Sequence, residues 1–133
     1  MTPYTAKLRR SDRLRFLAIA LLLCEGGVHL QQYESFLHLV PTINTLFLLN
    51  AVSAALLALA LAASRDHVAI LLALVAIGMT VVALVSLAIA RESVLFNYSE
   101  PTLRFPVLFA ALAELATVLV CSRFVAVRIR EPA

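Results

Sequence analysis

The sequence predicts an all-α protein, a bundle of four transmembrane helices with both the N- and the C-terminus in the cytoplasm. Hydrophobic residues make up 62% of the 133-residue chain and charged residues only 14%, whereas a soluble domain usually carries about 25% charge. Four apolar segments approach the roughly 20 residues that cross a bilayer as a helix. The basic residues gather at the borders of these segments, as topology signals do. We expect one membrane domain over residues 1–133.

The first two spans are predicted over residues 14–30 and 45–63. Ser11 is a candidate N-cap for the first, because its hydroxyl can accept a hydrogen bond from an amide of the first turn. Glu25 interrupts the apolar run and no small-x-small cleavage pattern follows, so we interpret this segment as an uncleaved helix. Small residues let helices approach closely in lipid. The second span carries such a stripe at Ala51, Ala55, Ala58 and Ala62.

The last two spans are predicted over residues 68–90 and 105–123. The connection of residues 64–67 is short and polar, so the second and third helices should form an antiparallel hairpin. Pro106 lies where the first turn of the fourth helix tolerates proline. The third span has no charged residue, and its small residues form a stripe at Ala69, Ala73, Ala76, Thr80 and Ala83.

The orientation follows from the positions of lysine and arginine. Five of the eleven lie before or at the start of the first span, Arg65 lies in the short turn and three lie at or after the end of the fourth span, so nine share one side. Only Arg91 and Arg104 lie on the other side. The positive-inside rule places the larger group in the cytoplasm. No basic face with interleaved aromatic residues is present, so nucleic acid is not an expected partner.

Each predicted span carries a polar residue near the middle of the membrane. A rise of about 1.5 Å per residue places Glu25 about 16 Å and Glu114 about 12 Å from the cytoplasmic ends, with Asn50 and Thr80 at roughly 18–20 Å. An ionised carboxylate at the bilayer centre costs at least about 2.5–3.5 kcal/mol on insertion scales. His29 lies one turn beyond Glu25 on the same helix face. We expect these side chains to turn inward and meet.

Convergence of these groups would form a cavity open towards the outer side, and Arg91 would either form its rim or neutralise a carboxylate. Three roles stay open for the cluster: hydrogen bonds that fix the bundle, a site for a lipid, quinone or other amphiphile, and a set of metal ligands, proton carriers or acid–base catalysts. Glu-x3-His on one helix is a weak metal signature, so neither a metal nor a cofactor is specified. The candidate ligand-binding residues are Glu25, His29, Asn50, Thr80, Arg91 and Glu114.

Sequence motifs of known enzyme classes are missing from the chain. It has no glycine-rich phosphate loop, no G-x-S-x-G and no H-E-x-x-H. Cys24 and Cys121 lie in apolar spans, and we interpret both as small buried residues rather than zinc ligands. We therefore name no catalytic residue and expect an accessory subunit or a binder of a lipophilic ligand. The alternative is an intramembrane enzyme, or a proton- or metal-handling carrier, that uses Glu25, His29 and Glu114.

The first half of the chain resembles small four-helix membrane proteins of actinobacteria in the stretches EGGVHL (25–30) and VPTINTLFLLNAV (40–52). Four short helices with Gly and His near the outer end of the first are also similar, more distantly, to the DoxX-like group. Some of its members are implicated in quinone-linked oxidation or in maturing redox enzymes. The resemblance implies a redox-accessory protein of a bacterial inner membrane. Expected partners are membrane lipids, with a larger membrane complex or a homo-oligomer as further alternatives.

Overall fold

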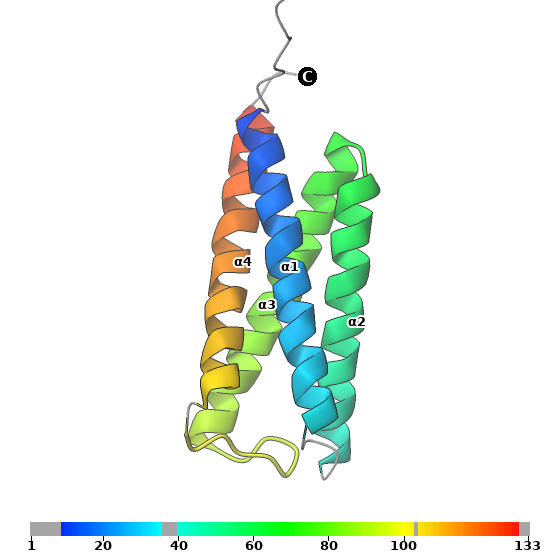
Figure 1. Ribbon diagram of the computed structural model, residues 1–133. Coiled ribbons are helices and arrows are strands. Elements are labelled where there is room, and N and C mark those ends of the chain that lie inside the picture. Colours follow the sequence, from blue (N-terminus) through cyan, green and yellow to red (C-terminus); the bar gives the residue numbers. More distant parts are fainter. Residues whose placement is uncertain (1–8, 36–39, 103, 131–133) are drawn as a thin grey trace, which may run out of the picture.

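The computed structural model describes residues 9–35, 40–102 and 104–130, and these residues are almost entirely helical. Figure 1 shows the four helices packed side by side: α1 (Arg10–Ser35), α2 (Pro41–Ala63), α3 (Asp66–Glu92) and α4 (Phe105–Arg130). α1 packs against α2 and α4, while α3 packs against α4 and only sparsely against α2. Each helix is long and apolar enough to cross a membrane. The prediction of an all-α protein with four such helices is therefore confirmed.

The helices extend beyond the predicted apolar spans, because backbone hydrogen bonding continues into the polar flanks. α1 begins at Arg10, and α4 runs on to Arg130. Ser11 is not the N-cap, so that prediction is wrong; the residue lies within the first turn and is buried. Instead, the backbone N–H of Arg9 donates to Asp12 Oδ2 at 3.3 Å. In a capping box, the side chain of the third helical residue accepts a hydrogen bond from the backbone N–H of the N-cap residue. Asp12 does this for Arg9.

One end of the bundle, which we call the terminal end, holds the described termini and the turn at Ser64–Arg65 (Figure 1). The opposite end, the loop end, holds the connection from α3 to α4. A core of mostly small residues fills the terminal half. Its buried members are Ala18, Leu22, Ala58, Leu61, Ala69, Ala73, Ala76, Cys121 and Phe124. This half of the bundle is therefore filled by side chains of the helices themselves.

The small-residue stripe of α3 faces the interior as predicted, with Ala69, Ala73, Ala76 and Thr80 all buried. On α2 the stripe is rotated from the predicted one. Its buried positions are Ala51, Ala54, Ala58 and Leu61, whereas Ala62 is exposed. Five alanines, at positions 51, 54, 55, 58 and 62, together cover one broad face of α2, so the sequence does not determine which part of that face turns inward.

α1 and α2 approach each other closely at Gly26. A Cβ atom added there would lie 3.2 Å from the backbone oxygen of Ala51 and 3.2 Å from the Cβ of Ala54. A Cβ added at the adjacent Gly27 would meet nothing within 4 Å. Gly26 is therefore the glycine that allows this helix contact.

The two cysteines occupy different environments. Cys121 is buried in the core, as predicted, whereas Cys24 is exposed on α1. The prediction of burial is therefore wrong for Cys24. Hydropathy marks the segment as apolar but does not show which of its faces turns away from the bundle.

Arg15 of α1 caps the C-terminal end of α2. Its Nε donates to the backbone oxygen of Leu61 at 2.7 Å, and its Nη2 donates to that of Ser64 at 2.5 Å. The last carbonyls of a helix have no partner within the helix, and a positive charge there is favourable for the helix dipole. Arg15 thus fixes the turn between α2 and α3.

We expect Arg15→Met to lower the free energy of unfolding by about 1–2 kcal/mol, because methionine keeps an apolar stem but cannot donate hydrogen bonds. Unfolding in mixed micelles, followed by circular dichroism, measures this loss. Arg13→Met, at an exposed position of the same helix, should change the value by less than about 0.5 kcal/mol. Equal losses in both variants would trace the effect to basic charge rather than to the cap.

Candidate functional site

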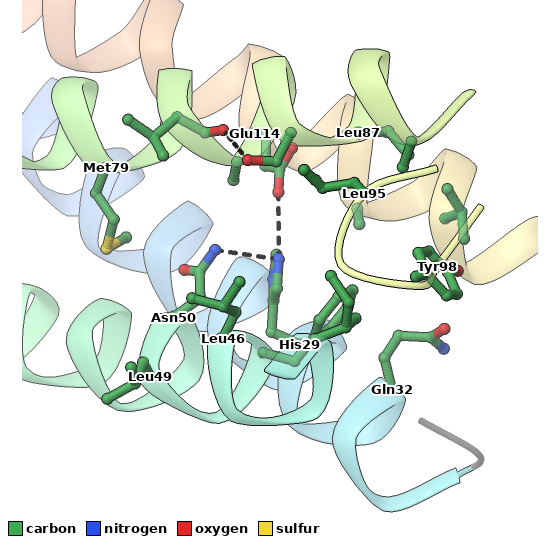
Figure 2. A pocket seen from close by; sticks show the side chains of 18 of the residues that line it. His29, Gln32, Leu46, Leu49, Asn50, Met79, Leu87, Leu95, Tyr98 and Glu114 are labelled. Carbon is green, nitrogen blue, oxygen red and sulfur yellow. Dashed lines mark hydrogen bonds and ion pairs between the residues drawn. The ribbon is translucent and has the colours of Figure 1, made fainter. Parts of the chain in front are cut away.

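A cavity of about 410 Å³ lies between the helices towards the loop end. All four helices and the connection from α3 to α4 contribute to its walls (Figure 2). Most lining side chains are apolar, such as Leu46, Leu49, Met79, Leu87 and Leu95. The volume lies within the range of roughly 300–1,000 Å³ that is typical of small-molecule sites.

His29 of α1 is the central polar group of this cavity. Its Nδ1 lies 2.9 Å from the backbone oxygen of Glu25. A carbonyl oxygen only accepts, so Nδ1 carries a hydrogen, and in a neutral imidazole Nε2 is then the acceptor. Asn50 Nδ2 lies 3.1 Å from Nε2 and donates to it. The Phe47 ring packs against the imidazole at a centroid distance of 5.0 Å, so the orientation of His29 is fixed from several sides.

Glu114 of α4 approaches the same nitrogen from the opposite wall (Figure 2), with Oε1 3.4 Å from His29 Nε2. This contact is attractive only when one hydrogen lies between the two atoms, on the carboxyl group or on Nε2. If Nε2 carries it, the amide of Asn50 must turn to present its oxygen. Asn50 Oδ1 has no hydrogen-bond partner among the described residues, so rotating the side-chain amide breaks no hydrogen bond of that oxygen with them. The pair can thus hold a proton in either of two places.

Glu25 and Thr80 form a second polar pair, packed behind the cavity rather than lining it. Both side chains are fully buried. Thr80 Oγ1 lies 3.2 Å from one carboxyl oxygen of Glu25 and 3.4 Å from the other, and the hydroxyl donates to this group. The pair joins α1 to α3 across the middle of the bundle. Its geometry is that of an interhelical packing contact.

A polar cluster that was not predicted from the sequence closes the loop end of the cavity. Glu100 is 3% exposed and accepts hydrogen bonds from Arg104 Nε at 3.0 Å and Arg104 Nη2 at 2.6 Å. The Tyr98 hydroxyl also donates to Glu100. Tyr98 and Glu100 both line the cavity. The available signal was the spacing of four residues between Glu100 and Arg104 within a short connection.

A tight turn holds this cluster over the cavity. Leu95 and Tyr98 exchange two backbone hydrogen bonds, of 2.7 and 2.9 Å. Between them, Phe96 and Asn97 have φ values of 48° and 62°, as in a type I′ turn. Positive φ is unusual for a bulky residue such as phenylalanine. The turn directs Leu95 and Tyr98 towards the cavity.

The six residues predicted to bind a ligand separate into a group that lines the cavity, a pair packed behind it and one exposed residue at the end of α3. These are His29, Asn50 and Glu114, then Glu25 and Thr80, then Arg91. In residues 9–35, 40–102 and 104–130, no group of three or more His, Cys, Asp or Glu is placed to hold a metal ion. No protein-family model, curated protein or solved structure matches the chain.

The protonation states of the loop-end cluster follow from its contacts. Burial and the hydrogen bond to Glu100 raise the pKa of Tyr98 to about 12, so the phenol keeps its proton. Burial alone would raise the pKa of Glu100, but hydrogen bonds from Arg104 and Tyr98 and the charge of Arg91 hold it below its usual range. Glu100 is therefore ionised at neutral pH.

The lowered pKa of Glu100 predicts that the connection loosens in acid. Its contribution to stability is fully present above the ordinary glutamate pKa of about 4.3 and is lost as the pH falls through the lower folded value. We expect hydrogen-exchange protection of residues 93–102 to fall in this acidic window. Glu100→Gln should remove this pH dependence, whereas Glu92→Gln, at an exposed position, should keep it. Unchanged pH dependence in Glu100→Gln would contradict the role of this carboxylate.

Proposed function

We propose that this protein holds a lipophilic ligand, a lipid or a quinone, in the cavity between its four helices. The supporting observation is the contrast within the cavity wall. Apolar side chains make up most of it, while His29, Asn50 and Glu114 form one polar group within hydrogen-bonding distance. An amphiphile matches this arrangement, with its body against the apolar wall and its head at the polar group. The protein acts as a ligand holder or accessory subunit, without turnover of its own.

We further propose that the protein lies in a bacterial inner membrane, with its terminal end in the cytoplasm. The positive-inside rule supports this orientation, because basic residues flank the described termini and Arg65 lies in the turn at the same end. Of the arginines in the described part of the chain, only Arg91 and Arg104 lie at the loop end. The more distant similarity of the four-helix plan, with Gly and His near the outer end of the first helix, to DoxX-like proteins supports an accessory role in membrane redox chemistry.

Purification in mild detergent tests the ligand directly. Mass spectrometry of co-purified lipids should find one species retained by the wild-type protein. His29→Phe keeps a ring but no ring nitrogen, and we expect it to retain at least about tenfold less of that species. His67→Phe, at an exposed position at the start of α3, is the matched control and should retain the wild-type amount. Equal retention in both variants, or none in the wild type, would refute the proposal.

A second candidate function is proton handling, which the contact between His29 Nε2 and Glu114 Oε1 favours. A pair that holds a proton in two places can pass it on when one side becomes accessible to water. Proteoliposomes containing a pH-sensitive dye measure this. Proton flux in the wild type and in His67→Phe, with loss in His29→Phe, would favour the proton carrier. An absence of flux with retained lipid would favour the ligand holder.

A further inference from the structure

α2 and α3 diverge from each other along the bundle. The two-residue turn at Ser64–Arg65 joins them at the terminal end, and from there α3 leans towards α4 (Figure 1). They pack against each other less extensively than the other neighbouring helices do. Both helices contribute lining residues to the cavity on the loop-end side of this contact. The gap between α2 and α3 therefore borders the cavity.

Side chains in this gap face both the cavity and the outside of the bundle. Leu46 and Leu49 of α2 and Val82 of α3 line the cavity, yet they are 44%, 56% and 66% exposed. On the opposite wall, His29 and Glu114 are only 6% and 3% exposed. The cavity thus opens sideways between α2 and α3, where four membrane-crossing helices would be surrounded by lipid.

The loop end, by contrast, is covered. Leu95, Tyr98 and Glu100 lie over the cavity, and all three line it. The backbone N–H of Glu100 donates to the backbone oxygen of Ala90 at 2.8 Å, and its carboxylate pairs with Arg104 at 2.6 Å. These bonds hold the connection against the end of α3. The sideways opening is consequently the more direct route to His29.

The lining residues also restrict the charge of the occupant. The described residues that line the cavity include no lysine or arginine, but they include two acidic residues, Glu100 and Glu114. Glu100 is already paired with Arg104, so a phosphate or carboxylate head would lie near the acidic Glu114 and find no cation of its own in the cavity wall, which is unfavourable at such burial. An uncharged head with hydroxyl or carbonyl groups can bond to His29 and Asn50 instead. The cavity of about 410 Å³ is near the lower end of the range for small-molecule sites, so it suits one hydrocarbon chain better than two.

We propose that an uncharged, single-chain amphiphile enters the cavity from within the bilayer, through the gap between α2 and α3. Its head reaches His29, Asn50 and Glu114, and its chain passes between Leu49 and Val82 into the surrounding lipid. This inference rests on the proposed ligand-holding function and adds the route and the charge class of the ligand.

The chain contains no tryptophan, so single tryptophans can report on the route. Val82→Trp and Leu49→Trp place one at the gap, and Leu119→Trp places one on α4, at a residue that is 70% exposed and does not line the cavity. An n-decyl benzoquinone, added to phosphatidylcholine nanodiscs, quenches tryptophan on contact. We expect saturable quenching at the two gap positions and only a gradual, non-saturating decrease at Leu119→Trp. Oleyl alcohol should relieve the saturable part, whereas oleate should not.

The failures of the two proposals are distinguishable. If the wild-type protein retains a co-purified lipid but quenching saturates at neither gap position, or equally at all three positions, the route is wrong and the ligand-holding function stands. Relief by oleate as effective as by oleyl alcohol overturns the uncharged class alone. If the wild-type protein retains nothing and no position saturates, both proposals fall.

Discussion

Gly26→Leu should destabilise the bundle by about 3 kcal/mol, because a larger side chain at a packed contact forces the helices apart. Even a single Cβ there would lie 3.2 Å from the backbone oxygen of Ala51, and backbone cannot move aside as a flexible side chain can. Cys121 provides the measurement, because it is buried and becomes reactive towards thiol reagents only when the bundle opens. A Cys24→Ala background removes the other of the two cysteines.

Gly27→Leu is the matched control, one residue along the same helix. The site is open, so replacing glycine should raise helix stability by up to about 1 kcal/mol. We expect thiol labelling to be much faster in Gly26→Leu and unchanged or slower in Gly27→Leu. Similar labelling of the two variants would show that α1 and α2 do not depend on close contact at Gly26.

The two intramembrane carboxyl groups should respond in opposite ways to substitution. Glu25 is fully buried against Thr80. We expect Glu25→Ala to cost about 2–4 kcal/mol of unfolding free energy, because it leaves a cavity and a hydroxyl that has lost its acceptor. Glu114 lines the ligand cavity, and Glu114→Gln keeps its size. We expect that variant to unfold within about 1 kcal/mol of wild type yet to retain at least about tenfold less ligand.

Unfolding in mixed micelles and lipid mass spectrometry on the same preparations separate these effects. Glu25→Gln is the conservative control and should recover most of the stability lost in Glu25→Ala, because an amide can still accept from Thr80. If Glu25→Ala lost ligand but kept full stability, Glu25 would belong to the binding site, and its assigned structural role would be wrong. If Glu114→Gln lost stability but kept its ligand, the assigned role of Glu114 in binding would be wrong.

The four helices were predictable because length and hydropathy leave little choice. A segment such as residues 68–90, without a charge over its whole length, has few alternatives to a membrane-crossing helix. The ends were less predictable, because hydropathy reports the apolar run whereas hydrogen bonding determines where a helix stops. Arg9, rather than Ser11, therefore precedes α1.

Which polar residues lie near mid-membrane could be predicted from the sequence, but which of them pair with each other could not. Depth along each span suggested that Glu25, Asn50, Thr80 and Glu114 would lie near one another. Depth does not fix helix rotation, and rotation decides that Glu25 pairs with Thr80 whereas Glu114 meets His29. The loop-end cluster was missed for a different reason. Its burial depends on a turn with positive φ at Phe96, a residue that does not usually adopt that conformation.

α2 and α3 pack only sparsely against each other, and both line the cavity on the loop-end side. Dispersion attraction grows with the number of neighbouring atoms, so this half gains less from contacts within the protein than the alanine-lined half. A molecule seated in the cavity would supply further neighbours and raise the melting temperature with its own concentration. Thermal stability of the purified protein should thus depend on what the surrounding detergent or lipid can place inside it.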